Sequence, residues 1–286
     1  MRVLVVGHRG MLGQDLMRAL DGRYALGGAD CDELDIREIE SVRECLKRHK
    51  PEVVINAAAY TNVDGAESEE ALARDVNAKG AGNIAKAARE MGIKTVHLST
   101  DYVFDGRKAG PYFEDDPTGP ISAYGRSKLE GEREVFEADP KALIVRTAWL
   151  YGRSGKNFVE TIIKLAGERD RLTVVDDQRG SPTWTMHLAQ GISQLVRAGA
   201  TGIVHATNSG ATTWYKFALK IIESAGKKGV RVEPITSDKL DRPAKRPSNS
   251  VLDGSKFTRL TGAPMPSWEE GLKRYMIDRS ESRSRP

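Results

Sequence analysis

Short apolar runs alternate with helix-like patterns through the first half of the chain. The apolar runs lie at residues 3–6, 25–29, 53–56, 95–98 and 143–146. They are apolar on both faces, which is typical of strands buried inside a parallel sheet. Apolar residues recur at helical spacing between them, at residues 10–20, 37–48, 69–91 and 123–136. This order predicts an α/β fold, a Rossmann-type doubly wound parallel sheet with helices on both faces.

The alternation loosens after residue 150, where glycine and proline turns become frequent. Helical patterns at residues 158–167, 185–197 and 213–225 alternate with short strand candidates at residues 172–175, 203–205 and 230–232. We expect one domain over residues 1–150. Residues 151–277 should form mainly a smaller C-terminal lobe, with some segments returning to the first domain. Residues 278–286 are rich in Ser and Arg and are predicted to be a frayed tail.

Composition excludes several classes of protein. Of the 286 residues, 39% are hydrophobic and 29% charged, so the chain can bury a core and is not globally disordered. The basic residues behind the net charge of +4 are scattered, which argues against a nucleic-acid partner. No apolar stretch is long enough to span a membrane, the first strand begins where a signal peptide would lie, and the two cysteines lack metal-ligand spacing. A cytoplasmic protein without a membrane partner is expected.

A glycine-rich loop follows the first predicted strand and opens the first predicted helix. Its sequence is GHRGMLG, residues 7–13. Glycines there allow a tight turn and let the backbone approach a pyrophosphate at the positive end of the helix dipole. Asp30, at the end of the second strand, could accept hydrogen bonds from an adenosine ribose, or could be a solvated turn residue. The loop predicts that residues 1–150 bind NADH or NADPH, and the absence of a cation at Cys31 favours NADH.

Two further segments could contact the same cofactor. Asp35 and Ile36 could touch the adenine. The small residues after the third strand would let a dinucleotide cross the sheet edge, although tight packing is the alternative reading. The predicted cofactor-binding residues are Gly7, Gly10, Met11, Leu12, Gly13, Asp30, Asp35, Ile36, Ala57, Ala58, Ala59 and Tyr60.

A tyrosine and a lysine lie four residues apart at the start of a predicted helix. Tyr124 and Lys128 therefore project from one face, where an ammonium beside a phenol lowers the pKa of that phenol. The pair also falls after the fourth strand, which ends in Ser99, Thr100 and Asp101 and offers a hydroxyl for a substrate carbonyl. We predict that Tyr124, Lys128 and Thr100 are catalytic.

These motifs resemble the dTDP-4-dehydrorhamnose reductase family of the extended short-chain dehydrogenase/reductase superfamily. The late blocks matter most, because they separate this family from epimerases and dehydratases that share the nucleotide domain. The matching blocks are GHRGMLG (7–13), NAAAYTNVDGAE (56–67), STDYVFDG (99–106), YGRSK (124–128), RTAWLYG (146–152), NF (157–158), DQRGSPT (177–183) and RPSNSVL (246–252).

The resemblance implies a step of nucleotide-sugar biosynthesis for cell-surface polysaccharide. The C4 keto group of dTDP-4-dehydro-6-deoxy-L-mannose would be reduced by NAD(P)H to give dTDP-L-rhamnose. Tyr124 would protonate the C4 oxygen, Lys128 would hold the nicotinamide ribose, and Thr100 would hydrogen-bond the same oxygen. Tyr124 and Lys128 would thus also contact the cofactor. Trp149 would pack on the sugar and Arg246 would bind the diphosphate. The implied substrate-binding residues are Thr100, Asp101, Tyr124, Trp149 and Arg246.

Several of these residues have a structural alternative. Trp149 could fill the core at the domain junction, and Arg246 could be a surface residue. Asp64 and Glu67 could be site residues, or a helix cap and a first-turn acid. No metal ligand is assigned.

The family also bears on assembly. The resemblance implies that a homodimer could form through magnesium held by interface carboxylates, with Asp15 as the candidate ligand. The apolar Met186 nearby argues against it.

Two rival functions remain at this stage. A 4,6-dehydratase or 4-epimerase would share the fold, but dehydratases carry Asp-Glu after the Thr, whereas this chain has Asp101-Tyr102. A non-catalytic regulatory subunit resembling that of methionine adenosyltransferase would not need Thr100, Tyr124 and Lys128 together. Cofactor preference, oligomeric state and the identity of the 6-deoxyhexose stay open.

Overall fold

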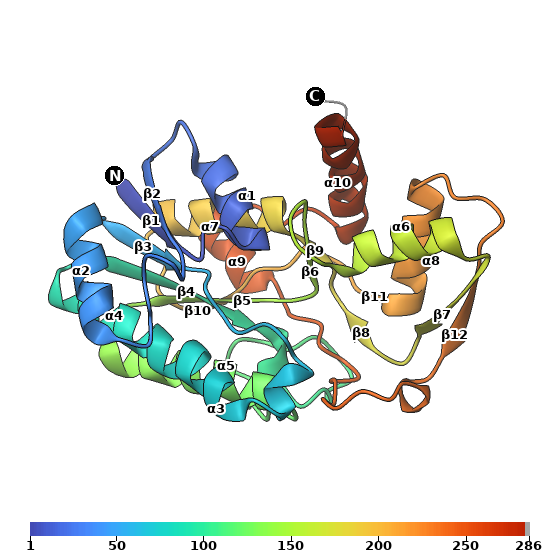
Figure 1. Cartoon of the computed structure of the whole chain (residues 1–286), viewed down its shortest axis with the longest axis horizontal. Helices are drawn as coiled ribbons and strands as arrows, with labels where there is room; N and C mark the ends of the chain where they lie inside the picture. The colour runs from blue at the N-terminus through green and yellow to red at the C-terminus, as the bar shows by residue number, and fades with distance from the viewer. Residues whose placement is uncertain (284–286) are drawn as a thin grey trace.

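Six parallel strands form the central sheet of the structure, a computed structural model that describes residues 1–283 (Figure 1). Their order is β10-β5-β4-β3-β1-β2. The order reverses between β1 and β3, and the carboxyl ends of strands at such a switch point form the usual ligand crevice. The prediction of a doubly wound Rossmann-type sheet is confirmed. The strands are β1 (Arg2–Val6), β2 (Ala25–Ala29), β3 (Val53–Asn56), β4 (Lys94–Thr100), β5 (Leu143–Thr147) and β10 (Gly202–His205).

Helices cover both faces of this sheet because successive side chains along each strand point to opposite sides. Val3 and Val5 pack on one side against helices α1 (Met11–Leu20), α7 (Thr185–Arg197) and α9 (Ser255–Thr261). Leu4 and Val6 pack on the other side against α2 (Ile39–His49) and α4 (Gly80–Glu90). Helix α5 (Ala123–Ala138) continues that second layer over β5. No helix among residues 1–283 is long and apolar enough to cross a bilayer.

The helix expected over residues 69–91 is present over residues 70–90, with one π-helical turn inside it. It consists of α3 (Glu70–Arg74), a π-helical turn η2 (Asp75–Lys79) and α4. In the π turn, the side chain of Asn77 bonds the backbone N–H of Tyr60 at 2.8 Å and its carbonyl at 3.1 Å. The same amide donates to the Ser127 hydroxyl at 3.0 Å. The irregular turn therefore holds the loop after β3 against α5.

A smaller second lobe packs beside the carboxyl ends of the strands (Figure 1). It is built around Tyr151, Phe217 and Leu272, which share one buried cluster. The chain returns from it to the sheet domain, since α7 packs on the sheet and the strand expected at residues 203–205 is β10 of the central sheet. The elements of the second lobe are α6 (Phe158–Glu168), β7 (Arg171–Val175), α8 (Trp214–Ser224) and β12 (Arg231–Ile235), with β7 parallel to β12.

Short paired segments and turns complete the described chain. Strand β6 pairs in parallel with β9, and β8 pairs antiparallel with β11. These small ladders connect the second lobe to the strand ends. Their bounds, with those of the short turns, are β6 (Leu150–Tyr151), β8 (Arg179–Gly180), β9 (Thr183–Trp184), β11 (Thr212–Thr213), η1 (Gly65–Glu67), η3 (Asp101–Val103) and η4 (Ser237–Lys239).

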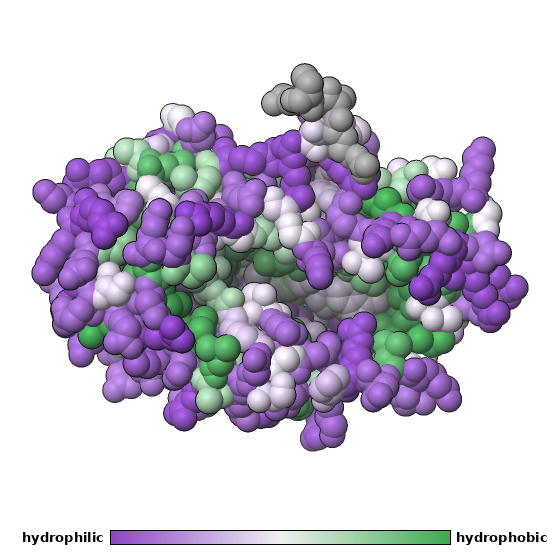
Figure 2. Space-filling view, in the orientation of Figure 1, coloured by the Kyte–Doolittle hydropathy of each residue, from purple (hydrophilic) through white to green (hydrophobic). Residues whose placement is uncertain are grey.

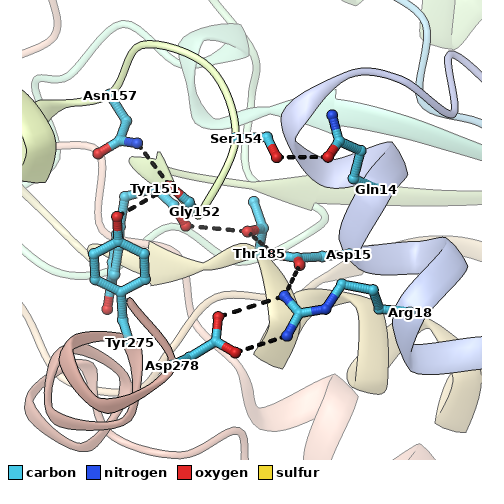
Figure 3. Close-up of polar contacts among 10 residues, drawn as sticks. All are labelled: Gln14, Asp15, Arg18, Tyr151, Gly152, Ser154, Asn157, Thr185, Tyr275 and Asp278. Carbon is cyan, nitrogen blue, oxygen red and sulfur yellow. Dashed lines mark hydrogen bonds and ion pairs between the residues drawn. The ribbon is translucent and has the colours of Figure 1, made fainter. Parts of the chain in front are cut away.

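The last helix, α10 (Trp268–Arg283), corrects the prediction of a frayed tail from residue 278. Asp278 pairs with Arg18 of α1 at 2.7 Å (Figure 3), and Arg279 pairs with Glu160 of α6 at 2.5 Å. These ion pairs hold the final turns of the helix to both lobes, which the Ser- and Arg-rich composition did not indicate. Residues 284–286 of the predicted tail lie outside the described residues.

A buried ion pair joins α5 to β5. Arg146 and Glu132 are 2% and 4% exposed, and Nε and Nη2 of the arginine donate to the two carboxylate oxygens at 2.8 and 2.6 Å. The hydroxyl of Ser99, on the neighbouring strand β4, donates to the same carboxylate at 2.5 Å. Such a pair is costly to break from one side, because the remaining charge stays buried.

Replacing Glu132 with Gln leaves the Arg146 guanidinium without a counter-ion at nearly constant volume. We expect the free energy of unfolding, measured by urea denaturation, to fall by about 3–5 kcal/mol. Glu130→Gln is the matched control, because Glu130 lies on the same helix and pairs with Arg74, which is 66% exposed. That change should cost at most about 1 kcal/mol. Equal losses in the two variants would contradict the role given to the buried pair.

Candidate active site

The predicted site residues gather where the carboxyl ends of the strands face the second lobe. Figure 2 shows the surface hollowed between the sheet domain and that lobe. Strand β4 ends at Thr100 and β5 ends at Thr147, two residues before Trp149. Tyr124 lies in the first turn of α5. The sheet therefore brings residues from separate parts of the chain to one edge.

The glycine loop between β1 and α1 forms a cradle that side chains would fill. Gly7 has φ +78°, and a Cβ there would lie 2.7 Å from the amide nitrogen of Ala58. A Cβ on Gly13 would lie 2.1 Å from the carbonyl oxygen of Gly7. Gly10 precedes α1 without a side-chain cap, so no side chain occupies the first-turn amides of Met11 and Leu12. This arrangement fits the pyrophosphate of a dinucleotide.

Asp30 lies at the end of β2 beside this loop. Its carboxylate accepts hydrogen bonds from the backbone N–H of Arg9 at 3.0 Å and of Cys31 at 2.9 Å. Partial burial raises the pKa of Asp30, but these hydrogen bonds outweigh burial and hold it below its ordinary value. The carboxylate is therefore ionised and suited to accept ribose hydroxyls.

Arg9 corrects the prediction that no cation lies near Asp30. Its guanidinium pairs with Asp32 at 2.8 Å and approaches Glu33 to 3.8 Å, on the turn that follows Asp30. Arg9 comes from the glycine loop, 21 positions before Asp30, so the residues next to Asp30 in the sequence do not reveal it. A cation therefore lies near Asp30, and the absence of one at Cys31 no longer favours NADH.

The other predicted cofactor residues are the pair Asp35 and Ile36 and the loop after β3. Ile36 is buried against Gly80, and the exposed carboxylate of Asp35 pairs with Arg37 at 2.7 Å. The loop from Ala57 to Tyr60 runs beside Gly7, because the Ala57 N–H donates to Val6 at 2.9 Å. At the far end of this loop, the Asn77 side chain bonds the backbone of Tyr60. Sequence reasoning missed Asn77, whose only signal was a polar residue on the buried side of a helical pattern.

Tyr124 and Thr100 lie in hydrogen-bond contact. Burial raises the pKa of the Tyr124 phenol to about 12, the hydrogen bond with Thr100 lowers it, and Asp101 raises it. The prediction that Lys128 lowers this pKa is wrong for this structure, because burial dominates and the ammonium is bound elsewhere. A neutral phenol is the form that can donate a proton.

Lys128 is buried one helical turn beyond Tyr124. Its Nζ donates to the carbonyl oxygen of Leu98 at 2.6 Å and lies 3.4 Å from Nε2 of His97. Burial lowers the pKa of Lys128 to about 8, although Glu132 opposes the shift. The lysine is therefore anchored to β4 at the level of the predicted nicotinamide site.

Trp149 lines the junction of the two lobes. Its backbone has φ +49°, a left-handed conformation that is unusual for a bulky residue and tends to occur at functional sites. Its indole stacks on Trp214 of α8, with ring centroids 3.5 Å apart and planes within 3°. A Cβ on Gly180 would lie 2.3 Å from the Trp149 ring. One face of the indole is thus covered by Trp214, a partner that the sequence did not reveal.

Arg246 reaches across to the sheet domain. It donates to both carboxylate oxygens of Asp64, at 2.7 and 2.8 Å, and is only 11% exposed. The guanidinium holds the pKa of Asp64 below its usual range. Glu67 accepts the backbone N–H of Ala123 at 2.8 Å, so it orients the first turn of α5. Asp64 precedes η1 without a side-chain cap, whereas Glu67 is the acid in the first turn of η1. A site role for either acid stays a prediction.

Asp15 does not form a magnesium site with the residues present. Its carboxylate accepts the Thr185 hydroxyl at 2.5 Å and Nη1 of Arg18 at 2.9 Å (Figure 3). Over residues 1–283, no group of three or more His, Cys, Asp or Glu could hold a metal ion. The carboxylate instead links α1 to α7.

Known proteins match this chain over nearly its whole length. The family model described as RmlD substrate binding domain matches residues 1–281. A dTDP-4-dehydrorhamnose reductase of Streptomyces griseus is 46% identical over 278 residues, covering 95% of this chain and 91% of the relative. A dTDP-4-keto-6-deoxy-D-glucose reductase of Streptomyces niveus is 43% identical over 273 residues, covering 95% of each. The crystal structure of dTDP-4-dehydrorhamnose reductase from Bacillus anthracis with NADP has a TM-score of 0.94 at 42% identity, covering 97% of this chain and 99% of that one.

The Trp149–Trp214 stack gives a direct test of this geometry. Gly180→Ala should displace the Trp149 ring, because the new Cβ would overlap it, and the tryptophan emission should shift to longer wavelength as the indole meets water. Gly110→Ala is the control, since a Cβ there has nothing within 4 Å. Identical emission spectra for Gly180→Ala and the parent protein would show that the ring is not confined by Gly180.

Proposed function

The chain belongs to the RmlD substrate binding domain family, and we propose that it reduces the C4 keto group of dTDP-4-dehydro-6-deoxy-L-mannose, giving dTDP-L-rhamnose with NADPH or NADH. It is therefore an NAD(P)H-dependent oxidoreductase. The observation that carries the proposal is the contact of Tyr124 and Thr100 at the end of β4, with Lys128 one turn away and the glycine cradle on the same sheet edge.

The residues present fit the nicotinamide cofactor. The bound cofactor supplies the hydride for the ketone. Gly7, Gly10 and Gly13 would hold its pyrophosphate, with the first amides of α1 directed at the negative charge. Asp30 would accept adenosine ribose hydroxyls, and Lys128 would hold the nicotinamide ribose. Asp35, Ile36 and the segment from Ala57 to Tyr60 would contact the adenine and the chain between the two nucleosides.

Tyr124 would supply the proton to the C4 oxygen. Its phenol is neutral at physiological pH, as a pKa of about 12 requires, and a positioned acid of this kind contributes about 10²–10⁴-fold to the rate. The wall formed by Trp149 and Trp214 would pack against the sugar. Arg246 would exchange the Asp64 carboxylate for the substrate diphosphate, because its planar fork suits both groups.

The site lacks what a dehydratase needs. In place of a second carboxylate it has Tyr102, and burial raises the pKa of that phenol far above its ordinary value. Tyr102 therefore cannot serve as the base that removes a sugar proton. A related 4-keto-6-deoxyhexose remains the nearest alternative substrate, because the Streptomyces niveus relative is a dTDP-4-keto-6-deoxy-D-glucose reductase. A cytoplasmic location and a homodimer stay predictions.

The decisive assay follows NADPH oxidation with the dTDP-4-keto sugar and identifies the product by NMR. We expect turnover that depends on both compounds and yields dTDP-L-rhamnose. A product with the other configuration at C4 would assign the enzyme to a different 6-deoxyhexose. Absence of turnover with every dTDP-4-keto sugar would reject the function.

Tyr124→Phe removes one hydroxyl and keeps the ring. We expect kcat to fall by about 10²–10⁴-fold because the positioned acid is lost, whereas dinucleotide affinity stays close to the parent value. Steady-state kinetics and fluorescence titration measure the two effects, and circular dichroism verifies folding. Near-normal turnover in this variant would contradict the role of Tyr124 as the proton donor.

Replacing Asp30 and replacing Arg9 should change the preference for NADPH over NADH in opposite directions. Arg9→Ala should lower kcat/KM for NADPH relative to NADH by about 10- to 100-fold, the range expected for one hydrogen bond to a charged group. Asp30→Ala should raise the same ratio by removing the negative charge. Arg107→Ala is the control, because that side chain is 87% exposed. A ratio that Arg9→Ala leaves unchanged would exclude the 2′-phosphate contact.

A further inference from the structure

The hydroxyl of Thr100 has its hydrogen-bonding capacity fully used. A hydroxyl offers one hydrogen and two lone pairs. The hydrogen of Thr100 is donated to Oδ1 of Asp101 at 3.0 Å, and one lone pair accepts the backbone N–H of Tyr102 at 3.2 Å. The second lone pair is left for the hydrogen bond with Tyr124. Thr100 therefore has no hydrogen to offer a substrate while it donates to Asp101.

The hydrogen bonds of Thr100 also decide which way the hydrogen of the Tyr124 phenol points. An ionised Asp101 can only accept, so Thr100 must donate to it, and Tyr124 must then donate its single hydrogen to Thr100. A protonated Asp101 can reverse the chain. Its O–H donates to Thr100, Thr100 donates to the phenolic oxygen, and the hydrogen of Tyr124 becomes free to point at a ligand oxygen.

Burial shifts Asp101 toward its protonated form. The side chain is 2% exposed, and Oδ2 is buried without a hydrogen-bond partner among the described residues. Burial raises the pKa of Asp101 to about 6, against the stabilising effects of Ser250 and Thr100. Oδ1 is the oxygen beside Thr100, so it carries the proton that passes to Thr100. The free Oδ2 is the oxygen that can exchange a proton with water.

Among residues 1–283, no cation pairs directly with the Asp101 carboxyl. The titratable neighbours are Tyr102 on its own turn and Tyr124 from α5, and both phenols are neutral. Arg246 and Arg242, on the segment after η4, act on Tyr102, and Arg246 is paired with Asp64. The carboxyl thus lies among neutral groups inside the site.

We propose that Asp101 is the proton store of the reaction, protonated before turnover and connected to the substrate through Thr100 and Tyr124. The proposal rests on the function given above. As the C4 carbon accepts a hydride, the O–H bond of Tyr124 breaks and its proton goes to the C4 oxygen. The Thr100 proton passes to the phenolate and the Asp101 proton to Thr100. The carboxylate left at Asp101 is protonated again by water, so the ketone gains one hydride and one proton.

The dependence of kcat on pH tests this role. The acid form of Asp101 is required, so kcat for ketone reduction should fall as pH rises through the pKa of Asp101. Asp101→Asn keeps a neutral donor beside Thr100 but cannot release a proton. We expect its kcat to be at least about 10-fold lower, below the range for a directly acting acid, and to lose that pH dependence. Asp115→Asn, which removes an exposed carboxylate, should keep the parent profile.

A spectroscopic titration tests the store without any substrate or cofactor. Infrared difference spectra of the parent protein against Asp101→Asn should show a carboxylic acid C=O band that disappears as pH rises through about 6. Thr100→Val removes a hydrogen bond to the carboxylate, so it should move this titration to higher pH. Circular dichroism verifies that both variants are folded.

The outcomes separate the two proposals. A parent enzyme that turns over, with no acid band and an unchanged profile in Asp101→Asn, would overturn the proton store and leave the reductase function standing. A parent protein that shows the acid band but reduces no dTDP-4-keto sugar would reject the function, and with it the relay. A band that titrates together with the loss of kcat supports both.

Discussion

The buried ion pair between Glu132 and Arg146 fixes the spacing on which the site depends. Glu132 lies on α5, the helix that carries Tyr124 and Lys128, and it bonds both β5 and the end of β4. Thr100 follows Ser99 directly on β4. The proton donor and the strand end that faces it are therefore held by one carboxylate, and the charge is tolerated because the pair is bidentate and fully hydrogen-bonded.

Around this pair, burial sets the protonation states that a reductase needs. Removal from water raises the pKa of Tyr124, lowers that of Lys128 and raises that of Asp101. Each shift moves the group toward its neutral form. Neutral Tyr124 and neutral Asp101 are proton donors, so the environment that disfavours charge also prepares the site to deliver a proton to a ketone.

The sequence predicted what depends on local pattern and missed what depends on distant contact. Periodicity located the strands of the sheet. The order of strand, loop and helix predicted the glycine turn at Gly7, and helical spacing predicted that Tyr124 and Lys128 share one face of α5. The bond between Asp64 and Arg246 joins residues 182 positions apart, and Asp278 reaches Arg18 across 260 positions. Neither contact has a local signal in the sequence. The Ser- and Arg-rich composition of the last residues therefore suggested a tail, whereas long-range ion pairs hold helix α10 in place.

Isotope transfer tests hydride delivery to C4 of the sugar most directly. The enzyme is supplied with NADPH that carries deuterium at the transferable position and with the dTDP-4-keto sugar, and the product is examined by NMR. One deuterium at C4 of the 6-deoxyhexose is the predicted result. Deuterium at another carbon, or a product without deuterium, would contradict the assigned reaction.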